Sequence, residues 1–192
     1  DHQIIQTWQQ FLASPWQMIG WQTLFLCLTI SVVIRGVQQG IEKATRFMMP
    51  ALYVILFVLV FYAATVGDFK QAFHFLFAFN LEKITPTIIV AAMGHAFFTL
   101  ALGAGAMLTY GAYVPNRINI ANAVWVAAAL DVLVAILSGL AIFPLVFAHH
   151  LAPNSGPGLM FVTLPIAFSH ITGGALIGGL FFLLLLFAAW TA

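Results

Sequence analysis

The chain has 192 residues, of which 63% are apolar and 6% carry a charge, whereas soluble domains average roughly 45–50% apolar and about 25% charged residues. Six Lys and Arg together with five Asp and Glu are too few to cover a globule of this size in water, which excludes a soluble protein. The net charge of +1 provides no basic field for phosphate groups, which excludes nucleic-acid binding.

Five stretches are long and apolar enough to cross a hydrocarbon layer about 30 Å thick, which takes about 20 residues of α-helix. Apolar residues occupy all sides of each stretch without a period of two, which favours helices over the strands of a membrane barrel. The sequence therefore predicts an all-α membrane protein with one transmembrane domain over 1–192. The expected spans are 18–35, 45–66, 86–113, 122–148 and 167–192, with an outer loop over 149–166.

The distribution of Lys and Arg between the connections predicts the orientation, because cytoplasmic connections are enriched in these residues. Four of them fall on one side: Arg35, Lys43, Arg46 and Arg117. Lys70 and Lys83 fall on the other, so the first span is expected to run inward and the loop 149–166 to lie outside. The chain begins with Asp1 and ends within a predicted span, and we therefore expect it to be an internal part of a longer chain.

The start of the second span is weakened by two residues, Gly40 and Pro50. Glycine lowers helix stability through its conformational entropy, and proline removes one hydrogen bond from the helix. This end of the helix is therefore a candidate for unwinding. The alternative is that Gly40 belongs to the connection and that Pro50 lies in the first turns, where proline is better tolerated.

The third span contains four glycines, each of which costs about 1 kcal/mol relative to alanine inside a helix. They are Gly94, Gly103, Gly105 and Gly111. The central sequence LGAGA is a candidate break, because the span would measure roughly 42 Å as one helix and so has residues to spare. Unwound backbone at this depth must face protein, an ion or a polar ligand. The alternative is that the glycines permit close packing of helices.

The fourth span contains an acidic residue, Asp131, about nine residues from its start. A lone carboxylate near the middle of a membrane costs about 2.5–3.5 kcal/mol, so it is expected to face a cavity, an ion or a partner. No Lys or Arg lies deep inside a predicted span, which leaves a sodium ion or a proton as the simplest partner. The alternative is a protonated Asp131 that hydrogen-bonds to a neighbouring helix.

The remaining residues of interest favour structural roles. His95 in the third span is expected to be a hydrogen-bonded core histidine, with a place in an ion site as the alternative. His149 and His150 are expected at the membrane interface, and Gly174 and Gly178 at a contact between helices. The chain has no zinc-protease, dinucleotide or Ser/His/Asp motif, so an enzyme is not expected.

Four segments carry a recognisable pattern: GHAFFTLALGAGAMLTYGAY, LDVLVAILSGLAIFP, GPGLMFVTLPIAF and FAAWT. In this order they resemble consecutive segments of the bacterial neurotransmitter:sodium symporters, and IRGVQQGIEKATRFMMP resembles the connection between that family's fourth and fifth helices. The match runs from Gln17 to Ala192. The resemblance implies that the five spans correspond to helices 4–8 of a fold of eleven or twelve helices with two inverted repeats. Helices 1–3 and those after helix 8 would then lie outside this chain.

The resemblance also implies roles for individual residues. The substrate would contact the broken third span, with Phe98 closing over it as a lid, through four positions: Phe98, Thr99, Ala101 and Ala104. Two sodium sites are implied, one at Thr99 and Asp131 and the other at the Ala188 carbonyl and the Thr191 hydroxyl. Three residues match parts of the inner gate: Gly40, Pro50 and Tyr113. The chain departs from the family's pattern at two positions where relatives carry Ser. Ala192 would remove one ligand of the second sodium, unless water or a later residue replaces it, and Ala101 would remove one side-chain bond to the substrate ammonium group.

The implied function is sodium-coupled symport of an amino acid across the bacterial cytoplasmic membrane, with no organic cofactor. Several relatives carry Phe where this chain has Ala104, so a bulky apolar or aromatic substrate is expected. Animal relatives bind chloride beside the first sodium, whereas bacterial ones place a carboxylate near that point, so Asp131 is expected to make transport independent of chloride. Two alternatives remain: a structural or quinone-binding subunit of a membrane enzyme complex, and a transporter of similar architecture that is driven by protons.

Overall fold

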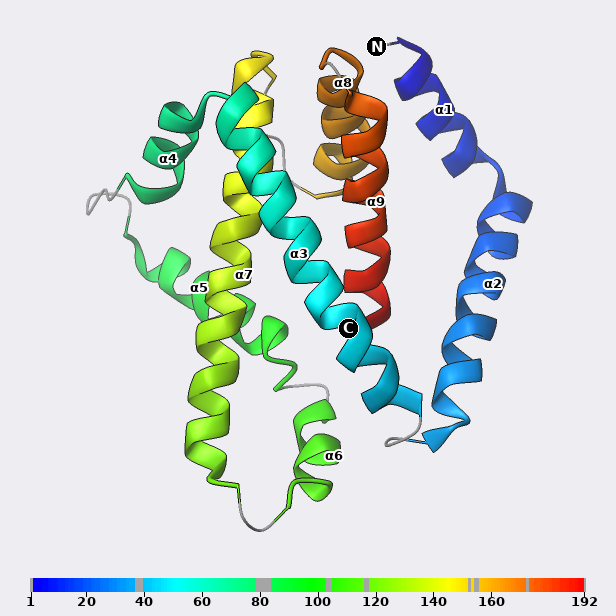
Figure 1. Cartoon of the computed structure of the whole chain (residues 1–192), viewed down its shortest axis with the longest axis vertical. Coiled ribbons are helices and arrows are strands. Elements are labelled where there is room, and N and C mark those ends of the chain that lie inside the picture. Colours follow the sequence, from blue (N-terminus) through cyan, green and yellow to red (C-terminus); the bar gives the residue numbers. More distant parts are fainter. Residues whose placement is uncertain are drawn as a thin grey trace. The chain divides into compact units, whose positions relative to one another are not determined.

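Figure 1 shows the computed structural model of the chain, in which every regular element of the described part is a helix. The structure describes residues 2–36, 40–78, 84–102, 105–115, 118–151, 153, 156–171 and 173–191. The predicted all-α fold class is therefore confirmed. The chain divides into two compact units, of which one comprises residues 1–73 and 138–192 and the other residues 74–137.

Four helices of the described part are long and apolar enough to cross a membrane: α2 (Pro15–Val33), α3 (Glu42–Val66), α7 (Ile120–Ala148) and α9 (Gly174–Thr191). The third predicted span is divided into α5 (Pro86–Thr99) and α6 (Ala106–Ala112). Shorter helices precede or connect these elements: α1 (His2–Ala13), α4 (Phe69–Phe77), the π-helical η3 (Leu159–Thr163) and α8 (Leu164–Ser169).

The core of the first unit lies where α3 packs along α9. Residues four or three positions apart lie on one side of a helix, so the buried residues of α3 form a single stripe. This stripe consists of Met48, Leu52, Leu56, Leu59 and Ala63. From α9, Ile177 and Phe181 are buried in the same unit. Lipid is as apolar as these side chains, so close packing between the two helices, and not removal of apolar surface from water, holds α9 against α3.

Two glycines of α9 allow α8 to pack against it. A Cβ atom on Gly174 would collide with the carbonyl oxygen of Phe168, and one on Gly178 would lie 3.3 Å from Cδ2 of the same phenylalanine. The predicted role of both glycines at a helix contact is confirmed. The predicted loop 149–166 is in part helical, because its apolar residues form η3 and the first turn of α8. α8 ends at Ser169, and the left-handed backbone of Gly173 (φ 78°) separates it from α9.

The corner between α3 and α4 packs on the C-terminal part of α7. Gly67 ends α3, with its N–H donating to the Ala63 carbonyl at 2.8 Å, and a Cβ atom at this position would lie 2.6 Å from Cβ of Pro144. The backbone N–H of Asp68 donates to the carbonyl of Pro144 at 3.0 Å. Only glycine permits this close approach, so the corner packs tightly on the end of α7.

The second unit contains the helices around the predicted break. Thr85 caps α5, because its side chain accepts a hydrogen bond from the Ile88 N–H at 3.3 Å, and Pro86 begins the helix at a position where its missing N–H is not needed. Asn119 caps α7 in the same way, accepting from the Asn122 N–H at 3.3 Å. These caps fix the starts of the two helices that carry the candidate site.

Candidate functional site

The break in the third span is a complete helix stop. At the end of α5, the N–H of Leu102 donates to the Phe97 carbonyl at 3.1 Å and the N–H of Ala101 donates to the Phe98 carbonyl at 3.0 Å. This pair of bonds is the Schellman arrangement, which requires a left-handed residue one position beyond the cap. Ala101 takes that conformation, with φ 50°, and an alanine there is strained by about 1–2 kcal/mol.

The stop changes which carbonyl groups are available at the end of α5. The Phe98 carbonyl accepts a hydrogen bond from the Ala101 N–H, and its second lone pair remains available. Within the described residues, no backbone N–H donates to the Thr99 carbonyl. A helix end also carries partial negative charge. The last turn of α5 is therefore suited to a cation or an ammonium group.

A cavity of about 400 Å³ lies within the second unit, beside this helix end. Its α5 wall consists of Ala92, His95, Ala96 and Thr99, which have the spacing of one helix face. The other lining residues come from α7 and α4: Asp131, Val132, Ala135, Ile136, Leu76 and Phe77. The predicted ion residues Thr99 and Asp131 thus line one cavity.

The charge of this cavity is set by Asp131. Within the described residues, no Lys or Arg lines it and Asp131 makes no hydrogen bond or ion pair. Hydrogen bonding of Asp131 to a neighbouring helix is therefore not found in the described part of the chain. The Thr99 hydroxyl donates to the Ala96 carbonyl at 3.3 Å, so its oxygen lone pairs remain available to a cation. An unpaired carboxylate and a hydroxyl oxygen are suitable ligands for a hard cation.

His95 lies on the cavity wall and is exposed. The expectation of a buried, hydrogen-bonded core histidine is therefore wrong. It stands four residues before Thr99, on the same face of α5 as the other lining residues. Leu76 and Phe77 of α4 were not expected from the sequence, because nothing in a short connecting segment indicates which cavity it borders.

The predicted substrate residues are described in part. The Phe98 side chain is 83% exposed, and Ala101 occupies the left-handed position of the helix stop. Gly103 and Ala104 lie outside the described residues. Gly105 follows with φ 74°, and its carbonyl accepts from the Leu108 N–H at 3.1 Å and from the Thr109 N–H at 3.2 Å. The glycine at 105 therefore starts α6, whereas the stop of α5 uses an alanine.

The two residues predicted for the second sodium site, Ala188 and Thr191, lie on α9 in the first unit. The Thr191 hydroxyl donates to the Ala188 carbonyl at 3.1 Å and to the Phe187 carbonyl at 2.9 Å. A hydroxyl or carbonyl oxygen in this position can bind a cation while the helix stays intact. Ala192, where many relatives carry Ser, lies outside the described residues.

Two of the predicted gate residues, Gly40 and Pro50, lie in the first unit, and Tyr113 lies in the second. Gly40 is buried, and a Cβ atom on it would collide with the Val32 carbonyl. α3 continues through Pro50, and Tyr113 follows the end of α6 with its side chain 62% exposed.

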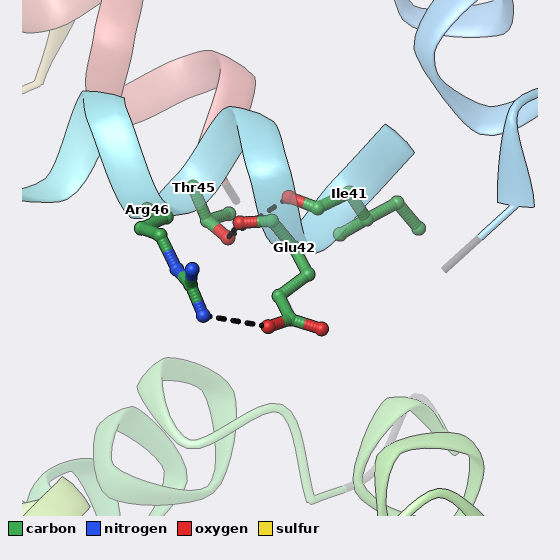
Figure 2. Close-up of polar contacts among 4 residues, drawn as sticks. All are labelled: Ile41, Glu42, Thr45 and Arg46. Carbon is green, nitrogen blue, oxygen red and sulfur yellow. Dashed lines mark hydrogen bonds and ion pairs between the residues drawn. The ribbon is translucent and has the colours of Figure 1, made fainter. Parts of the chain in front are cut away.

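Figure 2 shows the first turn of α3. Thr45 donates to the carbonyls of Ile41 at 2.9 Å and Glu42 at 3.1 Å, and Arg46 pairs with Glu42 at 3.1 Å. The Arg46–Glu42 pair is exposed on both sides, so it contributes less than about 1 kcal/mol.

The comparisons with known proteins agree along nearly the whole chain. A family model described as the sodium:neurotransmitter symporter family matches residues 4–192. The sodium-dependent transporter YhdH of Bacillus subtilis (strain 168) is 39% identical over 181 residues, which cover 94% of this chain and 40% of that protein. The sodium-dependent nutrient amino acid transporter 1 of Drosophila melanogaster is 29% identical over 179 residues, covering 88% of this chain and 27% of that protein.

A solved structure shares the fold. The crystal structure of MhsT in complex with L-phenylalanine aligns with a TM-score of 0.84 and 42% sequence identity, over 96% of this chain and 42% of MhsT. The chain therefore spans about two fifths of the length of these relatives, because it covers 40% of YhdH and 42% of MhsT.

Proposed function

This chain belongs to the sodium:neurotransmitter symporter family, and we propose that the protein couples the entry of sodium to the entry of an amino acid across the bacterial cytoplasmic membrane. The relatives named above are transporters and not enzymes. Family membership argues against the alternative of a quinone-binding subunit. Helices that precede Asp1 and follow Ala192 would complete the two sites, and lipid would cover the apolar outer surface.

The observation that carries the proposal is the cavity at the helix break. It combines an unpaired carboxylate from Asp131, a hydroxyl oxygen from Thr99 and a free helix C-terminus. Sodium bound there would neutralise the carboxylate and hold α5 beside α7. The carbonyls of Phe98 and Thr99, with the position of Ala101, would then bind the substrate ammonium group, and the exposed ring of Phe98 would cover it. Ala188 and Thr191 would hold a second sodium.

Two observations support a substrate class. The resemblance places Ala104 where several relatives carry the larger Phe, and MhsT was crystallised with L-phenylalanine. We therefore infer that the substrate is a bulky apolar or aromatic amino acid. The electrical part of the driving force is about 2.3 kcal/mol per charge for each 100 mV of membrane potential.

The proposal is tested by uptake into proteoliposomes. The transporter is reconstituted, and accumulation of labelled L-phenylalanine is followed with an inward gradient of sodium and then with the same gradient of choline. We expect concentrative uptake with sodium only, which collapses when a sodium ionophore removes the gradient. Equal uptake with sodium and choline, or uptake driven by a pH gradient alone, would contradict sodium coupling.

We further propose that the first turns of α3 act in the inner gate. Pro50 cannot donate a hydrogen bond to the carbonyl of Arg46, four residues earlier, so the helix is weaker here than elsewhere. Pro50→Ala restores that donor and should slow turnover severalfold, while sodium-dependent binding of substrate stays close to normal. Gly40→Ala is not a clean variant, because its new Cβ atom would collide with Val32. Unchanged turnover of Pro50→Ala would show that the proline is tolerated and not functional.

A further inference from the structure

Three histidines gather where the C-terminal ends of α7 and α8 meet. α7 ends in a Schellman arrangement, in which the N–H of Leu151 donates to Val146 and that of His150 to Phe147, both at 3.0 Å. His150 has the left-handed conformation (φ 52°) that this arrangement requires, which makes His149 the cap of α7. His170 is the cap of α8. The rings of His149 and His170 lie 5.9 Å apart, centroid to centroid, with their planes at 34°.

The imidazole of His149 is poorly placed to carry a positive charge. Its Nε2 atom is buried and has no hydrogen-bond partner within the described residues. A neutral imidazole can leave one nitrogen unpaired, but a protonated one has two N–H donors, and a buried charged donor without an acceptor is strongly unfavourable. Burial, then the neighbouring His170 and His150, lower the pKa of His149 from its usual 6.5. The C-terminal end of α7 acts in the opposite direction, but the net direction is downward.

The surroundings supply no described acid that would stabilise a protonated His149. Residues 132–192 contain no Asp, Glu, Lys or Arg, so η3, α8, α9 and this end of α7 carry only histidines as titratable groups. From the corner of α3 and α4, Asp68 and Lys70 are exposed, and the Asp68 carboxylate accepts from the Gln71 N–H at 3.0 Å. α1 reaches η3 through the Trp8 ring, 4.8 Å from Phe161. Its titratable residue, His2, has a side chain outside the described part.

We propose that His149 and His170 form an acid-sensitive joint, which holds the ends of α7 and α8 together while His149 is neutral and opens when His149 takes up a proton. α8 itself is fixed to α9, because Phe168 packs directly on Gly174 and Gly178. Opening therefore separates the end of α7 from the α8–α9 pair. This inference concerns a conformational change and does not depend on sodium coupling or on the substrate.

The direction of the pH effect follows from proton linkage. In the closed joint the pKa of His149 lies below the value of 6.5 that an exposed histidine has, so the open form binds more protons than the closed form in the interval between the two values. The closed joint is fully stable above pH 6.5 and loses stability as the pH falls below it. Uptake of one proton shifts the opening equilibrium by up to about tenfold per pH unit in that interval.

The test measures the accessibility of a buried position beside the joint. Val146 is fully buried, and a Val146→Cys reporter is placed in a Cys27→Ser background. The full transporter in lipid nanodiscs is labelled with a water-soluble maleimide between about pH 7.5 and about pH 5.5. Each rate is divided by that of a Ser169→Cys reporter, which is exposed on α8, to remove the effect of pH on thiol reactivity. We expect the ratio to rise about tenfold toward acid pH, as the linkage of one proton allows.

Variants of the histidines separate the joint from a general effect of acid. His149→Phe retains a ring without a nitrogen to satisfy and should keep the ratio low at every pH, and His149→Gln provides a second uncharged side chain if the phenylalanine variant does not fold. His150→Asn is the matched control, because asparagine tolerates the left-handed conformation and His150 is exposed; it should retain the pH response. A flat ratio in the unmodified joint would overturn the proposal, as would an acid response that persists in both variants of His149.

Discussion

Asp131→Asn should weaken sodium-dependent substrate binding at least tenfold in chloride-free buffer and leave insertion into the membrane unchanged. Asn keeps the size of the side chain and one oxygen ligand but removes the charge. A unit charge about 4 Å from sodium contributes about 4 kcal/mol at an effective dielectric constant of about 20, and a third of this energy is already about a tenfold change in affinity. Among the described residues that line the cavity, Asp131 is the only carboxylate, so none of them could substitute for it.

The same variant tests whether Asp131 replaces an anion. If fixed negative charge is what the cation requires, chloride should restore part of the sodium-dependent binding of Asp131→Asn and have no effect on the unmodified protein. Thr191→Val is the comparison, because it removes one oxygen from the other predicted sodium site: it should raise the sodium concentration needed for transport without creating a chloride response. Normal sodium-dependent uptake by Asp131→Asn without chloride would assign Asp131 a structural role.

The sequence located the break in the third span correctly but not the residue that produces it. Glycines tolerate positive φ, so Gly103 and Gly105 indicated LGAGA as the site of the break. The stop of α5 lies earlier, at Ala101, where an alanine takes a conformation that its own preference disfavours. Only the hydrogen bonds from Ala101 and Leu102 back into α5 identify it. A left-handed alanine leaves no compositional signal, so sequence alone could not have found it.

Helices without a long apolar stretch were also missed. The lengths of α2, α3, α7 and α9 follow from the thickness of a membrane, whereas α1, α4 and α8 are too short for that criterion. α8 is held by its contact with Gly174 and Gly178 of α9, which the sequence did indicate as a packing site. The prediction for His95 was wrong for a different reason. Because α5 is apolar on all sides, its sequence does not show which face borders a cavity until the helix that shares the cavity is known. Here that helix is α7, which contributes Asp131.

Ala104→Phe should reverse the substrate preference. Ala104 lies outside the described residues, between the stop of α5 at Ala101 and the start of α6 after Gly105. We propose that its methyl group borders the space for the substrate side chain. A phenyl ring at this position would fill that space, and a large substrate would lose the burial of its own side chain, which is worth about 1.5–3 kcal/mol. This corresponds to a loss of roughly tenfold to a hundredfold in affinity for phenylalanine or leucine.

Competition uptake in proteoliposomes measures the preference, with labelled substrate displaced by glycine, alanine, leucine, phenylalanine and tryptophan. The unmodified protein should prefer the large side chains, and Ala104→Phe should prefer glycine and alanine because these fit beside the new ring. Ala91→Phe is the matched control: the same substitution at an exposed position of α5 that does not line the cavity should leave the order of competitors unchanged. If the unmodified protein already binds glycine more tightly than phenylalanine, or if Ala104→Phe keeps its preference for large side chains, the space beside Ala104 does not select the substrate.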